Sequence, residues 1–439
     1  MRGLKRILLP LLAALLLSGC AMQTLDELYC LPKRSEAYKH LQSAIDSAMD
    51  GREYCAPLSG ENLQTVQMAD LDGDGVDEHL LFSKAASDSP LQILIFRQTE
   101  EEYVLSDVIR STGAAFDVVE YARVDDRPGY EIIVGHQVSD QVVRSLSVYS
   151  YADGKATALM SANYTKFVTY DLNADGRSEV MVLHPGESDE TNGLAELYSF
   201  SGGAMERSAQ IGMSASVDRL KRVVTGKLHG GQPAVYTACS VDESAIITDV
   251  FAIVNGQFTN VTFSNESGTS VQTLRNYYVY ADDVDEDGVM ELPDLITMRS
   301  PGSVNIADQQ YLIRWYAMTA SGAEVDKGYT YHNFHGGWYL ALPSELAPYV
   351  AVLQMGSSYE FYLWNEDFVE AQKLLTVYAL TSSDRDEQAE QDNRFPLYRG
   401  EKVIYAARLE GASAACGITR ESLTGSFRLI HQDWKTGET

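Results

Sequence analysis

The chain has 439 residues, more than one hydrophobic core usually organises, so we expect one large repeat domain or two to three ordinary domains. Asp and Glu number 62 against 34 Lys and Arg, and the formal net charge of −28 argues against nucleic-acid binding, because a polyanion repels phosphate backbones. Hydrophobic residues make up 45% of the chain and aromatic residues 10%, which supplies a sizeable core and excludes a disordered, solvating chain.

The N-terminal segment has the pattern of a secretory signal. Three basic residues precede an apolar run from Ile7 to Leu17, which is too short to span a bilayer. The run ends in Leu17-Ser18-Gly19-Cys20, which resembles the lipobox of bacterial lipoproteins. The resemblance implies that residues 1–19 are a signal peptide and that Cys20 is lipidated. We therefore expect an extracytoplasmic protein that is anchored to a cell membrane by its lipid alone.

Residues 20–59 are expected to form the lipidated cysteine, a short tether and an N-terminal helix. Between Ser35 and Met49 the apolar residues recur at helical spacing. Cys30 and Cys55 flank this pattern and could form a disulfide, because export permits oxidation. The alternative is that both are small buried hydrophobic residues.

Residues 60–330 repeat one unit. Three copies read D-x-[DN]-x-D-G-x-x-E and end at Glu78, Glu179 and Glu291, while two degenerate copies end at Glu131 and Ala234. Each unit carries four strand-like runs divided by turn signals. Four antiparallel strands per unit are typical of a propeller blade. The sequence therefore predicts a mainly β fold, a β-propeller-like array of about five four-stranded blades; a β-solenoid is the rival.

The acidic motif has the chemistry of a site for a hard cation. Oxygens at positions 1, 3 and 5, a backbone carbonyl at position 7 and a carboxylate at position 9 can converge on one ion, and Gly at position 6 permits the sharp turn. An EF-hand would instead place its Glu at position 12, between two helices. The expected ligands are Asp70, Asp72, Asp74, Val76 and Glu78; Asp171, Asn173, Asp175, Arg177 and Glu179; and Asp283, Asp285, Asp287, Val289 and Glu291.

A strand, an acidic loop of this kind and a second strand resemble the FG-GAP/VCBS-type repeats of integrin α-chain propellers and of many bacterial surface proteins. The resemblance implies up to three structural Ca²⁺ ions in blade hairpins and loops that face a partner. The Phe-Gly and Gly-Ala-Pro signatures themselves are missing. The degenerate loops at Arg127-Pro128 and His229-Gly230 have lost most ligands, so we expect no calcium there.

After residue 330 the acidic loop disappears, and residues 331–439 are expected to form an α+β cap or an altered final blade. Four strand-like runs are followed by a helix that begins at Thr419 as its N-cap and places Leu423, Phe427 and Ile430 on one face. Residues 381–393 read as an acidic loop.

Catalytic signatures are missing from the sequence: it contains no G-x-S-x-G, no phosphate-binding Gly-rich loop and no H-E-x-x-H. His332 and His335 form the only paired-histidine feature and are expected to be structural or surface residues. We therefore expect a module that binds an unidentified extracellular protein or glycan. The alternative is a carbohydrate-active hydrolase or lyase with its carboxylates in the propeller funnel.

Overall fold

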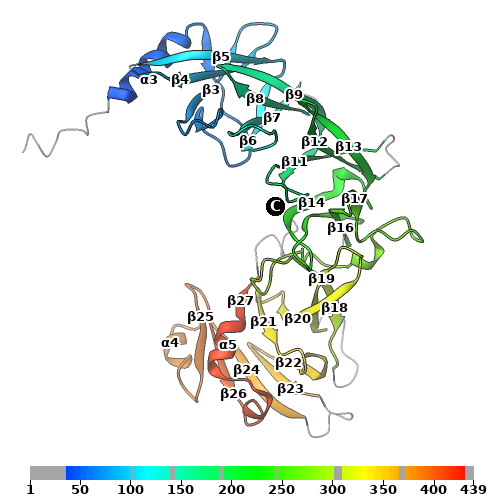
Figure 1. Ribbon diagram of the computed structural model, residues 1–439. Coiled ribbons are helices and arrows are strands. Elements are labelled where there is room, and N and C mark those ends of the chain that lie inside the picture. Colours follow the sequence, from blue (N-terminus) through cyan, green and yellow to red (C-terminus); the bar gives the residue numbers. More distant parts are fainter. Residues whose placement is uncertain are drawn as a thin grey trace, which may run out of the picture.

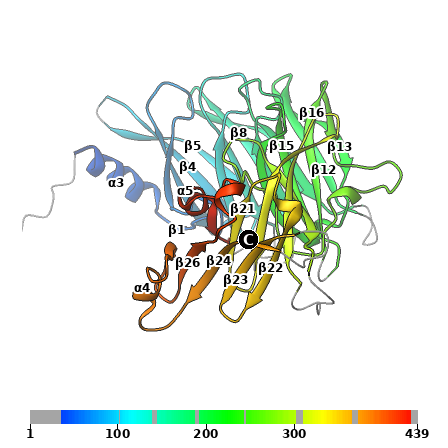
Figure 2. The same cartoon turned by 90° about the horizontal axis from the view of Figure 1, so that it is seen from below.

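The computed structural model describes residues 36–100, 102–138, 144–186, 192–242, 245–300, 309–364 and 371–430. The fold is mainly β, as predicted, and is built from antiparallel sheets of four or five strands. Figure 1 shows these sheets following one another along a curve in chain order, and Figure 2 shows the same array from below. The signal segment, Cys20 and Cys30 lie outside the described residues, so lipidation and the disulfide stay predictions.

The first three sheets correspond to the first three repeat units. The first contains β1 (Arg52–Tyr54), β2 (Val66–Ala69), β3 (Glu78–Ala85), β4 (Leu91–Gln98) and β5 (Tyr103–Ser111). The second contains β6 (Ala115–Ala122), β7 (Glu131–Gln137), β8 (Arg144–Ala152) and β9 (Lys155–Tyr164). The third contains β10 (Lys166–Tyr170), β11 (Glu179–His184), β12 (Leu194–Ser201) and β13 (Ala204–Gly212).

The remaining sheets complete the curve. The fourth contains β14 (Leu220–Lys227), β15 (Pro233–Ser240), β16 (Ile246–Val254) and β17 (Gln257–Asn260). The fifth contains β18 (Glu291–Thr297), β19 (Tyr311–Met318), β20 (Glu324–Asn333), β21 (Trp338–Leu342) and β27 (Phe427–Leu429). The sixth contains β22 (Val350–Met355), β23 (Ser358–Leu363), β24 (Gln372–Leu380), β25 (Phe395–Arg399) and β26 (Ile404–Leu409). The expected domain boundary between residues 330 and 331 falls inside β20.

Each pair of consecutive sheets shares a buried apolar cluster. Leu80 and Phe82 of β3, for example, lie in one cluster with Phe116 and Val134 of the second sheet. Equivalent clusters join the second sheet to the third, the third to the fourth, the fourth to the fifth and the fifth to the sixth. Among the buried clusters of the described residues, none combines the first sheet with the sixth. Stability therefore comes from contacts between neighbouring sheets, as in other repeat arrays.

Helices cover the outer faces of the array at both ends. The α3 helix (Glu36–Ala48), which the apolar spacing predicted, buries Ile45 against Leu81, Leu94 and Phe96 on the face of the first sheet that points away from the second. At the other end, Ala389 directly after α4 (Arg385–Gln388) packs on Ile404 and Ala406 of the sixth sheet. Terminal repeats need such covers because their outer faces have no neighbouring sheet.

Two expectations for the C-terminal stretch need correction. The segment read as an acidic loop contains α4, and β25 follows it. The terminal helix α5 (Arg420–Ser426) starts with the predicted Thr419 cap, which accepts a hydrogen bond from the Ser422 amide. It ends before Phe427, however, because residues 427–429 form β27 and pair with β21. Hydrogen bonding to this open sheet edge outweighs the helical periodicity of Phe427 and Ile430. In the described part of the chain, no helix combines the length and apolarity needed to cross a membrane.

Candidate metal sites in the acidic loops

The three acidic loops occupy equivalent places in the first, third and fifth sheets. The first acidic loop (residues 70–78) joins β2 to β3, and the second (171–179) joins β10 to β11. The third (283–291) precedes β18, and the strand expected before it is reduced to a single bridge between Asp282 and Glu291. The loops therefore end hairpins or near-hairpins rather than linking helices, as the flanking residues predicted.

All three loops have the same backbone turn. Position 4 is left-handed in each, with φ of 76° at Gly73, 60° at Ala174 and 61° at Glu286. Position 6 is also left-handed and is always glycine, with φ of 86° at Gly75, 89° at Gly176 and 83° at Gly288. Only glycine adopts this conformation without strain, which explains why position 6 carries it.

The same three hydrogen bonds hold each loop. The position-1 carboxylate accepts the amide of the position-6 glycine, at 3.0 Å for Asp70, 2.9 Å for Asp171 and 2.8 Å for Asp283. The position-5 carboxylate accepts the position-7 amide, the bonds being Val76 to Asp74, Arg177 to Asp175 and Val289 to Asp287. The position-9 glutamate accepts the position-2 amide, the bonds being Leu71 to Glu78, Leu172 to Glu179 and Val284 to Glu291. These bonds hold the carboxylates in place, and each leaves further oxygen lone pairs free for an ion.

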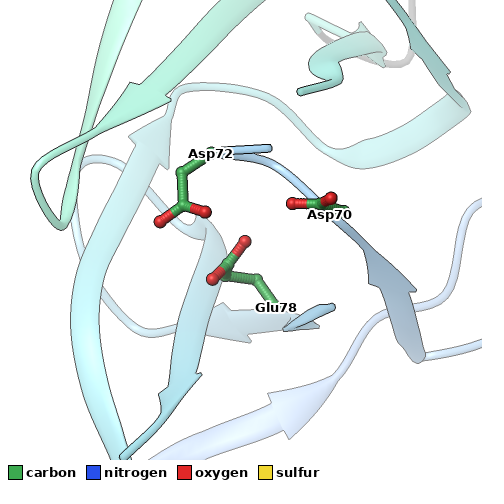
Figure 3. A group of neighbouring side chains, drawn as sticks. All are labelled: Asp70, Asp72 and Glu78. Atoms are coloured by element: carbon green, nitrogen blue, oxygen red, sulfur yellow. The ribbon is translucent and has the colours of Figure 1, made fainter. Parts of the chain in front are cut away.

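The first loop brings three carboxylates together. Asp70, Asp72 and Glu78 each offer an oxygen, and these oxygens lie within 4.8 Å of one another. Figure 3 shows the carboxylates of Asp72 and Glu78 pointing toward each other, with that of Asp70 beside them. Among the ion pairs of the described residues, none involves these three side chains or Asp74. The cluster could hold a metal ion.

The surroundings of Glu78 in the first loop disfavour its ionised form when no cation is bound. Glu78 is 2% exposed. Burial, together with the charges of Asp72, Asp74 and Asp70, raises the pKa of Glu78 to about 7, against the opposing hydrogen bond from Leu71. A bound cation would reverse this balance, since it stabilises the ionised forms of all four groups.

The second loop is less acidic. Its position 3 is Asn173, whose side-chain amide donates to Glu179 at 2.6 Å. Arg177 donates to Asp175 at 2.8 Å, and this hydrogen bond is the main reason why the pKa of Asp175 is lowered. Asp171, Asp175 and Glu179 do not form a compact group of three carboxylates comparable to those of the other two loops. Hydrogen bonds from a side-chain amide and from an intraloop arginine therefore already satisfy part of the carboxylate oxygens in this loop.

The third loop again clusters its carboxylates. Asp283, Asp285 and Glu291 offer oxygens within 4.8 Å of one another, so this group too could hold a metal ion. Glu291 is fully buried, and burial with the charges of Asp285 and Asp287 raises its pKa to about 7. Its Oε1 atom accepts no hydrogen bond from the described residues. Lys327 of β20 forms ion pairs with Asp285, Asp287 and Glu291.

The degenerate loop of the second sheet keeps part of this arrangement. Glu131, at position 9, is 1% exposed and accepts the Val124 amide at 2.8 Å. Asp125, at position 3, is fully buried and is paired with Arg127 at 3.1 Å. From the sequence alone, Arg127 is only a residue in a loop that has lost most of its ligands. Its place at position 5, between two acids of the motif, is the signal that could have identified it as an internal cation.

The loops also lie where consecutive sheets meet. The position-8 amide of one unit donates to a carbonyl in the loop of the preceding unit, as Tyr130 does to Asp70 and Ser178 to Arg123. Met290 likewise donates to the Lys227 carbonyl of the fourth sheet. A β-carbon added to Gly73 would meet the Pro128 carbonyl oxygen at 2.3 Å, so the loops of the first and second sheets are in close contact. An ion in such a loop would therefore stabilise both a hairpin and a contact between sheets.

Two other sequence features have different surroundings. His332 is 2% exposed, stacks on Tyr339 with ring centroids 5.0 Å apart, and has its pKa lowered to about 3 by burial. His335 is exposed. Cys55 is half-buried beside the cluster between the first two sheets, and Cys239 is buried.

A cavity of about 290 Å³ lies beside the third loop. Its walls include Trp315, Tyr329 and Tyr339 together with the charged residues Asp285, Lys327 and Arg428. Asp285 is the one acid among the described residues that line it.

In comparisons with known proteins, no model of a protein family matches the chain, and no curated protein matches its sequence.

Proposed function

We propose that the acidic loops bind Ca²⁺ and that these ions stabilise the contacts between neighbouring sheets. The observation that carries the proposal is the repeated loop geometry, in which the same turn and hydrogen bonds present carboxylates at positions 1, 5 and 9 of all three loops, joined at position 3 by an aspartate or asparagine. Carboxylate and carbonyl oxygens are the ligands of hard cations, and Ca²⁺ tolerates the irregular geometry of such a loop. The first loop fits this role best, because no basic side chain of the described residues is ion-paired with its buried Glu78 or its three aspartates.

We also propose that the array is propeller-like, with blade-type sheets arranged around a curve and covered rather than closed at its ends. The support is the nearest-neighbour packing of the sheets and the cover that α3 forms on the first of them. Propeller and repeat architectures present a row of loops on one side of the array, which suits binding of an extended partner. The function that follows is a non-enzymatic module that binds a protein or glycan outside the membrane, tethered through a lipid on Cys20.

The calcium proposal is tested by unfolding the protein thermally with Ca²⁺ and with EDTA. We expect dissociation constants of roughly 10⁻⁴–10⁻³ M. At Ca²⁺ concentrations well above these values, each occupied site should add about 1–3 kcal/mol to the free energy of unfolding. The combined variant Asp74→Ala, Asp175→Ala and Asp287→Ala should lose this response. A matched variant that removes three exposed acids, Asp88→Ala, Glu266→Ala and Glu345→Ala, should retain it. An identical melting temperature with Ca²⁺ and with EDTA in the wild type would reject the proposal.

Anchoring and binding need separate measurements. Cells fed labelled palmitate should label the wild-type protein and leave a Cys20→Ser variant unlabelled. The purified protein in Ca²⁺ should retain a partner from the native envelope or a glycan from a printed panel, and the triple loop variant should retain less. Release of sugar or peptide fragments by the purified protein would instead support the hydrolase or lyase.

A further inference from the structure

The third acidic loop differs from the first in having a lysine ammonium group among its carboxylates. Lys327 lies in β20, outside the loop in sequence, and its side chain is 14% exposed. Its Nζ atom lies 3.4 Å from Asp285 Oδ2 and 3.5 Å from Glu291 Oε1, and it donates a hydrogen bond to Asp287. One cation of the chain therefore contacts three of the four carboxylates that would bind the metal.

The buried Glu291 shows that the loop needs positive charge in this place. Its Oε2 accepts the Val284 amide at 3.0 Å, whereas its Oε1 accepts no hydrogen bond from the described residues. A fully buried carboxylate oxygen without a donor is costly unless a cation lies near it. The nearest ion-pair partner of this oxygen among the described residues is Lys327.

The cavity beside the third loop gives the Lys327 side chain room to move away from the loop carboxylates. Lys327 and Asp285 both line the cavity of about 290 Å³ between the loop, β20, β21 and the end of α5. Ser344 and Ser426 also line the cavity, and serine hydroxyl groups can solvate an ammonium group. The side chain can therefore turn away from the carboxylates without rearranging the sheet.

We propose that Lys327 is a tethered cation that competes with Ca²⁺ for the third acidic loop. The loop is then a low-affinity, exchangeable site, while the first loop, which has no such competitor, is the high-affinity site. Uptake of Ca²⁺ by the third loop transfers the Lys327 ammonium to the cavity, so the charge of this surface follows the external calcium concentration. This inference rests on the proposed function, because it requires that the loops bind Ca²⁺.

Lys327 resembles Arg127 of the second sheet in its effect, since each places a basic side chain among acids of the repeated motif. The two differ in where they lie in the sequence and in whether a metal ion can replace them. Arg127 is part of its own loop, and that loop lacks the acid at position 1 and the glycine at position 6. Lys327 comes from another strand, and the third loop keeps its full set of ligands, so a metal ion can replace it.

The test is calorimetric titration of CaCl₂ into a protein in which only the third loop is intact, through Asp74→Ala and Asp175→Ala. In this background Lys327→Met should tighten Ca²⁺ binding about tenfold, the scale of one charged hydrogen bond. The control is Lys373→Met, which removes a lysine that is ion-paired with Glu360 in the sixth sheet and should leave the affinity unchanged. In EDTA, Lys327→Met should also melt at a lower temperature than its background. Saturating Ca²⁺ should abolish this difference in melting temperature.

The outcomes separate the two proposals. Unchanged or weaker Ca²⁺ binding by Lys327→Met in this background would overturn the role of Lys327, even if the wild-type protein binds Ca²⁺ through its first loop. Absence of Ca²⁺ binding by the wild-type protein would overturn the proposed function itself.

Discussion

The loops of the first and second sheets lie against each other, and each has a buried glutamate at position 9, yet the charges around these two glutamates differ. Glu78 and Glu131 are both almost fully buried, and each accepts the amide at position 2 of its loop. In the second sheet the chain supplies a cation, because Arg127 at position 5 pairs with Asp125. In the first sheet position 5 is Asp74, and among the ion pairs of the described residues none involves this acid or the cluster of Asp70, Asp72 and Glu78.

The difference separates the parts of the motif that hold the fold from the parts that we propose bind an ion. The hydrogen bond from position 2 to the glutamate is present in both loops and holds the hairpin. Position 5 is basic in the second loop and acidic in the first, where we propose that a bound ion supplies the positive charge. Position 6 follows the same division: Gly75 has φ of 86°, whereas Pro128 is locked near −65° and cannot form the acidic turn.

The largest effect should come from removing the buried acid that Arg127 neutralises. Asp125→Ala deletes a fully buried carboxylate that accepts hydrogen bonds from the Arg127 amide, the Arg127 guanidinium and the Ser150 hydroxyl. The variant should lower the free energy of unfolding in urea by about 3 kcal/mol. The loss should be the same in Ca²⁺ and in EDTA. Asp126→Ala, its exposed neighbour, should change little. A loss that appears only in Ca²⁺ would mean that the second loop also depends on metal.

A smaller effect should follow from placing a basic residue at position 5 of the first loop, as Arg127 is placed in the second. Asp74→Arg places a guanidinium at position 5, within reach of Asp72, and should raise stability in EDTA by about 1 kcal/mol. In a background of Asp175→Ala and Asp287→Ala, it should also abolish the stabilisation by Ca²⁺. Asp74→Ala is the matched control, since it removes the acid without supplying a cation and should gain less in EDTA. Equal behaviour of the two variants would show that position 5 acts only through the loss of its negative charge.

Much of this arrangement could be predicted from the sequence, because the motif and the strand pattern are local. The spacing of Asp70, Asp74 and Glu78 indicates a turn with convergent oxygens, and the runs on either side indicate strands that the structure confirms as β2 and β3. The helical spacing around Ile45 likewise predicted α3. What the spacing could not indicate is that this helix covers the outer face of the first sheet, because that depends on which face of β3 lacks a neighbouring sheet.

The remaining features arise from contacts between distant segments. Lys327 contacts the third loop only because β20 pairs with β19, which in turn pairs with β18 in the fifth sheet, and no local sequence pattern marks it. Phe427 continues a helical pattern and nevertheless begins β27, because β21 offers an unpaired edge. Arg127 is the exception, because its place at position 5 of the motif is visible in the sequence.

The smallest effect should be a change in pH dependence that belongs to the second loop. Burial, reinforced by the charge of Asp125, raises the pKa of Glu131 against the hydrogen bonds that it accepts from Val124, Asp125 and Ser150. As pH rises from the unfolded-state value near 4.5 through the higher folded-state value, the unfolded chain releases this proton first, so the free energy of unfolding falls. Glu131→Gln keeps an acceptor for the Val124 amide and does not titrate. Its stability relative to the wild type should therefore grow with pH across that window and level off above it, as urea unfolding at a series of pH values in EDTA would measure. A difference that shrinks with rising pH would mean that Arg127 already holds Glu131 ionised, and the chain would then neutralise the second loop as completely as we expect Ca²⁺ to neutralise the first.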